Sequence, residues 1–379
     1  MKKIIVLVNI LLFVSANAQT TVLKTADSLY NYGNFSKAIA FYNQLDNPLE
    51  YADKIAKSYY YIGNYDQAID YYNKALLNNP NNQLIKFEQC KLLFQNGQLA
   101  KAKTHLLDLI KADQSNPNYY YFLGLVGNAS DNFETAQDNF LKAYQLDQTH
   151  QNAIFELAKY SLQKRAFKKV EDYVNKGLES YPNNKKLIGL IAQKHYLNNE
   201  YHESISQFLK LLDLGETTKF VYEKLGYCYG KVYYYSKAIK YLDLALKSDP
   251  KDANNHYLLG VNYEQIRKYD LAEKHVLEAI KLLDQPLDEQ YAKLGVLYNL
   301  QDKPAEAIQA FTNAIKENPK SESNYFFRTF TKLDYFKDLD AKQKEVQKFN
   351  NQFPNSKYSE ILNLKLAKFK SEKFQNKTE

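Results

Sequence analysis

The chain repeats itself every 34 residues, and this period constrains its fold more than any other feature. A small residue recurs at this interval along most of the sequence, and Val170 is the one β-branched exception. The full series consists of Ala68, Ala102, Ala136, Val170, Ser204, Ala238 and Ala272. It extends to Ala38, 30 residues earlier, and to Ala307 and Ala341, 35 and 34 residues further on. A fixed period of this length predicts a solenoid, in which each repeat touches only its neighbours.

The best-defined repeat covers residues 49–82 and has the pattern of two helices. The first presents an apolar face at i, i+3, i+4 and i+7 spacing, formed by Ala52, Ile55, Ala56 and Tyr59. Gly63 then ends this helix, because glycine readily adopts the left-handed backbone conformation that other residues resist. A second apolar face follows at Ala68, Tyr72 and Ala75. Pro80 ends the repeat, because proline cannot continue a helix.

The same frame fits ten units when the recurring small residue is numbered position 20 of each repeat. Position 8 is always small: Ala26, Ala56, Cys90, Gly124, Ala158, Ala192, Gly226, Gly260, Gly295 and Thr329. Position 17 is large and apolar in the first eight repeats: Phe35, Tyr65, Leu99, Phe133, Phe167, Tyr201, Tyr235 and Tyr269. We predict that the two helices of each repeat cross closely at position 8, and that position 17 forms a wedge between helices.

These positions resemble those of the tetratricopeptide-repeat family. The family's first-helix Leu-Gly-x-x-Tyr core is found at Leu225-Gly226…Tyr229, Leu259-Gly260…Tyr263 and Leu294-Gly295…Tyr298. Its second-helix pattern is found at Ala68…Tyr72…Ala75…Pro80 and Ala307…Phe311…Ala314…Pro319. Position 4, often Trp in the family, is mostly Tyr or Ile here, which still fills the site with a large apolar group. The resemblance implies an all-α fold: a right-handed α-solenoid of about ten helix-turn-helix repeats over residues 19–355.

The N-terminus departs from the repeat pattern. Lys2 and Lys3 precede an apolar run over 4–14, and Ala16 and Ala18 follow it. This layout predicts a secretory signal peptide at 1–18, cleaved near Ala18-Gln19. A buried first helix or a membrane anchor is the alternative, but the run is much shorter than the ~20 residues that span a bilayer. We expect a periplasmic or otherwise exported protein with no transmembrane segment after cleavage; retention in the periplasm and secretion both stay open.

The first and last repeats are irregular. The first is four residues short, and the tenth is degenerate, with Arg328 and Lys332 at core positions. Residues 356–379 are predicted to form a capping helix and a polar tail. No Gly/Ser/Pro-rich linker interrupts the repeats, so the sequence indicates no domain boundary within the solenoid.

The charge distribution narrows the classes of partner, and the spacing of the cysteines argues against a disulfide. The net charge is +7, but acidic and basic residues are interspersed, whereas nucleic-acid binding needs a basic cluster on one surface. We therefore expect no nucleic-acid partner. Cys90 and Cys228 lie four repeats apart, so they cannot reach the ~7 Å Cα separation that a disulfide needs.

No motif for chemistry is present. The sequence has no nucleophile elbow, phosphate-binding loop or dinucleotide fingerprint. Its six histidines show no metal-ligand spacing. We expect a protein that is not an enzyme, with no catalytic residue, metal or cofactor.

The resemblance instead places function in a groove. In the family, the first helices line the concave face, mainly at positions 2, 5, 9 and 12. The partner-binding candidates in this sequence are Tyr60, Phe87, Lys91, Phe94, Tyr121, Phe155, Lys159, Tyr196, Tyr227 and Tyr257. Phe87, Tyr121 and Phe155 are predicted to form a ladder of rings flanked by Lys91 and Lys159, unless position 5 packs against the next repeat.

Two functions fit such a groove. The first is a non-enzymatic scaffold or adaptor of the bacterial cell envelope, which holds a peptide or helix of another protein through a few aromatic anchors. The alternative is a glycan-binding module for cell-wall or surface polysaccharide, because rings also stack on sugars. Sequence alone does not separate a peptide from a glycan or fix the partner, the pathway or the oligomeric state.

Overall fold

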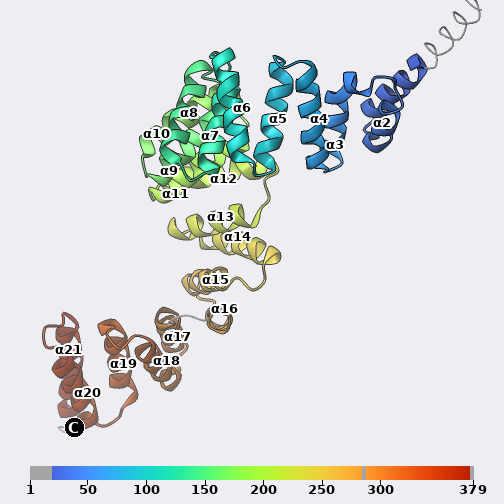
Figure 1. Ribbon diagram of the computed structural model, residues 1–379. Helices are drawn as coiled ribbons and strands as arrows, with labels where there is room; N and C mark the ends of the chain where they lie inside the picture. The colour runs from blue at the N-terminus through green and yellow to red at the C-terminus, as the bar shows by residue number, and fades with distance from the viewer. Residues whose placement is uncertain (1–18, 284–286, 376–379) are drawn as a thin grey trace, which may run out of the picture. The chain divides into compact units, whose positions relative to one another are not determined.

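The computed structural model describes residues 19–283 and 287–375 (Figure 1). These residues form α-helices joined by short turns, with one 3₁₀ helix, η1 (Pro48–Tyr51). The all-α repeat fold expected from the sequence is confirmed. The predicted signal peptide at 1–18 lies outside the described residues and stays a prediction.

The chain divides into two compact units, which meet between residues 184 and 185. In the described part of unit 1, residues 19–31 are helical and precede α2 (Phe35–Tyr42) and η1. The remaining helices of unit 1 are α3 (Ala52–Tyr61), α4 (Tyr65–Asn78), α5 (Gln83–Gln95), α6 (Leu99–Ala112), α7 (Pro117–Ala129), α8 (Phe133–Leu146), α9 (Gln151–Gln163) and α10 (Phe167–Ser180).

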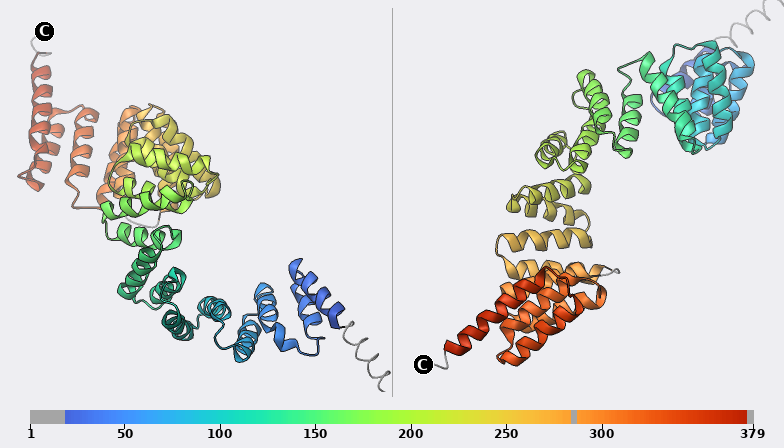
Figure 2. Two further views of the ribbon diagram at one scale, coloured as in Figure 1. Left: turned by 90° about the horizontal axis from the view of Figure 1, so that it is seen from above. Right: turned by 90° about the vertical axis from the view of Figure 1, so that its left-hand side faces the viewer.

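Unit 2 continues the same alternation of first and second helices. Its first five helices are α11 (Lys185–Leu197), α12 (Tyr201–Asp213), α13 (Lys219–Lys231), α14 (Tyr235–Ser248) and α15 (Ala253–Gln265). The others are α16 (Tyr269–Leu282), α17 (Asp288–Leu300), α18 (Pro304–Glu317), α19 (Glu322–Tyr335), α20 (Leu339–Gln352) and α21 (Tyr358–Gln375). Within each unit, consecutive helices pack side by side, as two further views show (Figure 2).

The turn inside each of the first nine repeats has one left-handed residue at position 15. Gly33, Gly63 and Gly97 occupy this position in the first three repeats, with φ of 77°, 79° and 72°. The next six repeats place a non-glycine residue there: Asp131, Arg165, Asn199, Tyr233, Arg267 and Asp302. In two repeats an asparagine then caps the second helix: the side chains of Asn64 and Asn132 accept hydrogen bonds from the Gln67 and Thr135 amides.

Close helix crossing at position 8 is confirmed. A Cβ added to Gly124 would lie 2.5 Å from the Phe140 ring, and one added to Gly226 would lie 2.6 Å from Leu242 Cγ. Both partners stand at position 24, on the second helix of the same repeat. A larger residue at position 8 would therefore force the helices of the repeat apart.

Position 20 is buried in the first nine repeats but not in the tenth. Ala68 and Ala136 are fully buried, whereas Ala341 is only half-buried. Ser204, the polar member of the series, donates a hydrogen bond to the Ala192 carbonyl 3.1 Å away. Cys90 and Cys228 are free and buried, as predicted.

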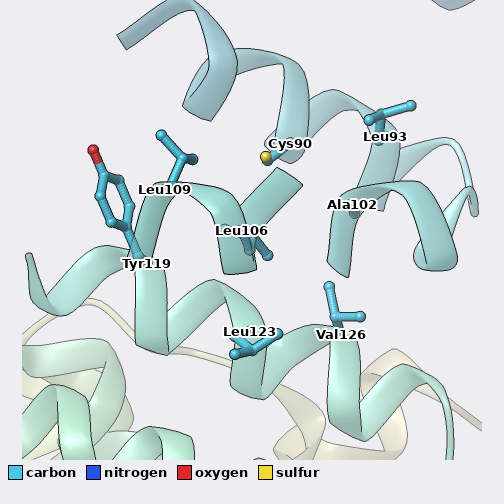
Figure 3. Close-up of a cluster of buried hydrophobic side chains, with 8 residues drawn as sticks. All are labelled: Cys90, Leu93, Ala102, Leu106, Leu109, Tyr119, Leu123 and Val126. Carbon is cyan, nitrogen blue, oxygen red and sulfur yellow. The ribbon is translucent and has the colours of Figure 1, made fainter. Parts of the chain in front are cut away.

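The core is a chain of local clusters between neighbouring repeats. One cluster joins α5, α6 and α7, and its side chains converge between these helices (Figure 3). Its members are Cys90, Leu93, Ala102, Leu106, Leu109, Tyr119, Leu123 and Val126. Such contacts fix each first helix against the next one.

The last helix, α21, packs on the tenth repeat through buried Leu362 and Leu366. Its exposed residues include polar Asn363 and Lys370 as well as apolar Ile361 and Leu364. None of the helices in 19–283 and 287–375 combines the length and the apolar character needed to cross a bilayer.

Candidate functional site

A cavity of 460 Å³ opens in unit 1 between the first helices α3 and α5, and we name it the α3–α5 groove. Helices α4 and α7 complete its walls. The lining residues are Lys57, Tyr60, Tyr61, Tyr72, Glu88, Lys91, Leu92, Phe94, Gln95 and Phe122.

The walls of the groove are built by the repeat itself. Lys57 and Lys91 both stand at position 9, and Tyr60 and Phe94 both stand at position 12. Residues 34 apart occupy the same place on successive first helices, so each wall presents a cation next to an aromatic ring. The groove is therefore a direct product of the period.

The base of the groove is apolar. Tyr72 and Leu92 are buried, and burial raises the pKa of the Tyr72 phenol far above its ordinary value. Phe122 from α7 closes one end and contacts Phe94 edge-to-face, with ring centroids 6.5 Å apart. Since these groups are neutral, the base offers an apolar surface to a ligand.

The rim of the groove carries two cations in different situations. The Lys91 ammonium lies 2.6 Å from the Glu88 carboxylate, and each side chain is only partly exposed. Lys57 is half-buried, and within the described part of the chain no carboxylate lies within ion-pair distance of its ammonium. The rim therefore has one ammonium left to meet an anionic group of a ligand.

Three of the residues predicted from sequence, Tyr60, Lys91 and Phe94, share this groove. Phe87 does not: its ring packs edge-to-face on Tyr119 and Phe122 of the next repeat, with centroids 5.1 and 5.2 Å apart. It is thus part of the contact between repeats, which is the alternative that the sequence left open for position 5.

Tyr121 packs against other rings of its own repeat. Its ring lies 5.9 Å from that of Phe140 and 5.2 Å from that of His150. Burial raises the pKa of its phenol to about 12. Phe122 touches both Phe87 and Tyr121 edge-on, so these rings are joined through a third ring in place of a regular ladder.

The two predicted flanking lysines lie over aromatic rings. Lys91 is 5.4 Å from the Phe87 centroid, and Lys159 is 6.0 Å from that of Phe155. Each ammonium thus covers one ring face that the ladder was expected to leave open.

Two of the three candidates in unit 2 pack into one filled cluster. Tyr196 and Tyr227 contact each other edge-to-face at 5.3 Å. Lys224 lies 4.1 Å over Tyr196, and Lys231 lies 5.1 Å over Tyr227. Tyr257 is half-buried against the cluster that joins α16, α17 and α18.

The groove also contains residues that the sequence analysis did not select. Lys57 stands at position 9, a position already assigned to the groove, and could have been chosen by its frame. Tyr61 and Phe122 stand at positions 13 and 6, outside the positions that the family implies. Only the packing of α3, α5 and α7 brings them to the cavity.

Part of the groove lies in a segment that matches a known family, while its α3 wall precedes that segment. Sequence models described as "Tetratricopeptide repeat" match residues 63–125, 221–252 and 293–321. The chain contains tetratricopeptide repeats (TPRs). The first of these matches includes α5 and most of α7, so two walls of the groove are TPR helices.

Several known TPR proteins are similar to this chain. Anaphase-promoting complex subunit 3 of Schizosaccharomyces pombe is 25% identical over 205 residues, 50% of this chain and 31% of that protein. A TPR repeat-containing protein of Methanocaldococcus jannaschii is 25% identical over 259 residues, 67% of this chain and 41% of that protein. The chain thus spans less than half the length of these curated relatives. A solved TPR protein from Parabacteroides merdae aligns at 15% identity and a TM-score of 0.43, over 66% of this chain and 98% of its own.

Proposed function

We propose that this TPR protein is a non-enzymatic scaffold of the bacterial cell envelope that holds a peptide or helix of another protein in the α3–α5 groove. The observation that carries the proposal is the open cavity at Tyr60, Phe94 and Phe122, with Lys57 at its rim. The groove offers both features of a protein interface: an aromatic centre and a charged edge.

Aromatic side chains supply the affinity. Tyr60, Tyr61 and Phe94 are rigid rings with few rotamers, so little conformational entropy is lost when a partner covers them. A cavity of 460 Å³ accommodates a few apolar side chains of a bound segment. Residues of this kind, placed at the centre of an interface, carry most of the binding energy in known complexes.

Charge sets the chemistry of the bound segment. Lys57 supplies a half-buried ammonium, while Lys91 is already neutralised by Glu88. A bound segment with an apolar residue and an adjacent Asp or Glu would satisfy both the rings and Lys57. A basic segment would bring two like charges together at the rim and would bind more weakly.

The packing of the candidate rings favours a protein ligand over a glycan. Sugar stacking needs an open ring face, but lysine ammonium groups cover faces of Phe87, Phe155 and Tyr196. Phe94 and Phe122 meet edge-on, which leaves a cleft instead of a flat platform.

Two further observations support a role in an envelope assembly. Residues 1–18 have the layout of a signal peptide, which would direct the mature chain out of the cytoplasm. The S. pombe relative is, by its name, a subunit of a multiprotein complex. Because the match covers only 31% of that relative, its partners do not identify the partner of this chain.

A charge reversal in the groove tests this function. The partner is first captured by cross-linking in intact cells and purified, and its dissociation constant for the wild-type chain is measured. Lys57→Glu is expected to weaken binding about tenfold, because it reverses the one unpaired cation of the rim. Lys103→Glu makes the same charge change on an exposed site of α6 and serves as the control. Equal affinity of both variants for the partner would contradict a binding site in the groove.

A further inference from the structure

Two histidines face each other between α15 and α16 in the eighth repeat. His256 Nδ1 lies 3.0 Å from His275 Nδ1, and the ring centroids are 5.2 Å apart. Tyr263 stacks on the His275 ring at 5.5 Å with an interplanar angle of 17°. Both imidazoles are half-buried, so their positions are fixed by packing while solvent still reaches them.

Hydrogen bonding determines which nitrogen of His256 carries its proton. His256 Nε2 lies 3.1 Å from the Pro250 carbonyl oxygen, which can only accept a hydrogen bond. Nε2 is therefore protonated in the neutral ring, and Nδ1 directs a lone pair at His275. His275 Nδ1 donates the shared proton to this lone pair.

We propose that His256 and His275 form a binding site for a divalent transition metal ion of the class of Zn²⁺, Ni²⁺ or Cu²⁺. Metal-bound imidazole nitrogens lie about 2.0–2.1 Å from the ion, so two of them in a tetrahedral site are about 3.4 Å apart. Opening the present 3.0 Å contact by a few tenths of an ångström creates that spacing. Imidazole is a preferred ligand for these ions.

The surroundings already resemble those of a metal ligand. Metal-binding histidines almost always donate their second N–H to a carbonyl or carboxylate, as His256 does to Pro250. In neutral His275 the proton need only move from Nδ1 to Nε2 to free a second lone pair at Nδ1.

The nearby charges act in opposite directions. Glu278 favours a cation near His275, whereas Lys274 disfavours one. Glu278 itself is paired with Lys281 at 3.0 Å. Across 19–283 and 287–375 no three His, Cys, Asp or Glu side chains converge on one point, so the protein supplies two ligands and water the remainder.

The preceding repeat shows that packing does not require histidine at these positions. Tyr222, Tyr229 and Tyr241 occupy the same three positions in the seventh repeat and form a stack. In the eighth repeat two of the three rings are imidazoles instead. The two histidines are 19 residues apart on different helices, a spacing that matches no metal-binding motif, so only the fold brings them together.

Calorimetric titration of the full-length, untagged chain with NiCl₂, repeated with ZnCl₂, tests the site. We expect one ion per wild-type chain and a saturable rise in melting temperature of at least ~2 °C. The double variant His256→Tyr/His275→Tyr gives the eighth repeat the same three tyrosines as the seventh, and it should lose both the binding of the ion and the rise in melting temperature. His202→Tyr, at an exposed position of α12, should keep both.

A second variant distinguishes loss of metal binding from loss of folding. His256→Gln keeps a hydrogen-bonding side chain at the site and should also abolish binding of the ion, while its melting temperature without metal stays close to that of the wild type. Binding of the ion by the double variant with wild-type stoichiometry, or no binding by the wild-type chain, would overturn the proposal.

Discussion

The same repeat positions form an open groove in unit 1 and a filled cluster in unit 2. At positions 9 and 12, Lys91, Tyr60 and Phe94 border a cavity of 460 Å³. At the corresponding positions of the sixth and seventh repeats, Tyr196 and Tyr227 contact each other at 5.3 Å, and Lys224 covers one of the rings. One repeat frame therefore supports two different surfaces.

The difference arises from which residue stands at position 9. A lysine there projects its charged end to water and leaves the ring at position 12 uncovered. A tyrosine there reaches the neighbouring ring and fills the space between the two first helices. Other positions differ as well: position 12 is Phe94 in the third repeat and Gly230 in the seventh.

The largest expected difference between the two regions is in partner affinity. Tyr60→Ala with Phe94→Ala removes two rings from the groove and should weaken partner binding about 100-fold, the effect of losing two interface anchors. Tyr196→Ala with Tyr227→Ala should leave the affinity within about threefold, because those rings already contact each other. Equilibrium titration of both double variants measures the contrast, and equal losses would remove the distinction between groove and cluster.

The sequence predicted the positions of the repeat frame better than it predicted the packing of side chains around the groove. Small residues at position 8 and the left-handed turn at Gly63 follow from steric rules that act within one repeat, and the structure confirms both. Tyr60, Lys91 and Phe94 could be selected because position alone brings them to the groove. The packing of Phe87 could not be predicted, because it depends on Phe122, a residue of the next repeat at a position with no assigned role.

Single variants of the two regions should differ in the opposite direction in their effect on stability. Tyr227→Ala removes an edge-to-face ring pair and a cation–π contact, and should destabilise unit 2 by about 1–2 kcal/mol. Tyr61→Ala removes a ring that is 53% exposed and should cost unit 1 less than about 1 kcal/mol. Hydrogen exchange in α13 and in α3 reports each loss locally, and a larger loss in α3 would contradict this ordering.

Substitutions at the turns of the two units should change stability by smaller amounts and with opposite signs. Gly63 in unit 1 has φ of 79°, so Gly63→Ala should destabilise its repeat by about 1 kcal/mol. Tyr233 in unit 2 has φ of 66°, so Tyr233→Gly relieves backbone strain and should stabilise its repeat by up to about 1 kcal/mol. Urea unfolding of both variants checks the two signs; loss of stability in Tyr233→Gly would show that the exposed ring has a packing role.

The smallest expected effect is a response to acid confined to the sixth repeat. A hydrogen bond from Lys194 holds the pKa of Glu200 down at about 2, below the 4.5 of a free glutamate, against the opposing effect of burial. Because the folded-state pKa is the lower one, this stabilisation is present above pH 4.5 and is lost between pH 4.5 and about 2. The corresponding residues of unit 1, such as Asn64 and Ala166, carry no charge.

Substitution of Glu200 by glutamine isolates this response. The glutamine variant should be less stable than the wild-type chain at pH 6, and the gap should close as the pH falls toward 2. Hydrogen exchange at the turn between α11 and α12, measured at both pH values, reports the difference in stability between the variant and the wild-type chain. A constant difference between wild type and variant across this range would show that the Lys194–Glu200 pair does not titrate as described.

Site-specific photo-cross-linking in living cells tests the central claim most directly. Tyr61 in the groove and Tyr234 at a turn of unit 2 are matched, with exposed fractions of 53% and 54%. Each is replaced in turn by the photoreactive phenylalanine analogue benzoylphenylalanine. We predict one discrete protein adduct from position 61, lost when Phe94→Ala is added, and none from position 234. An adduct from position 234 with none from position 61 would contradict it.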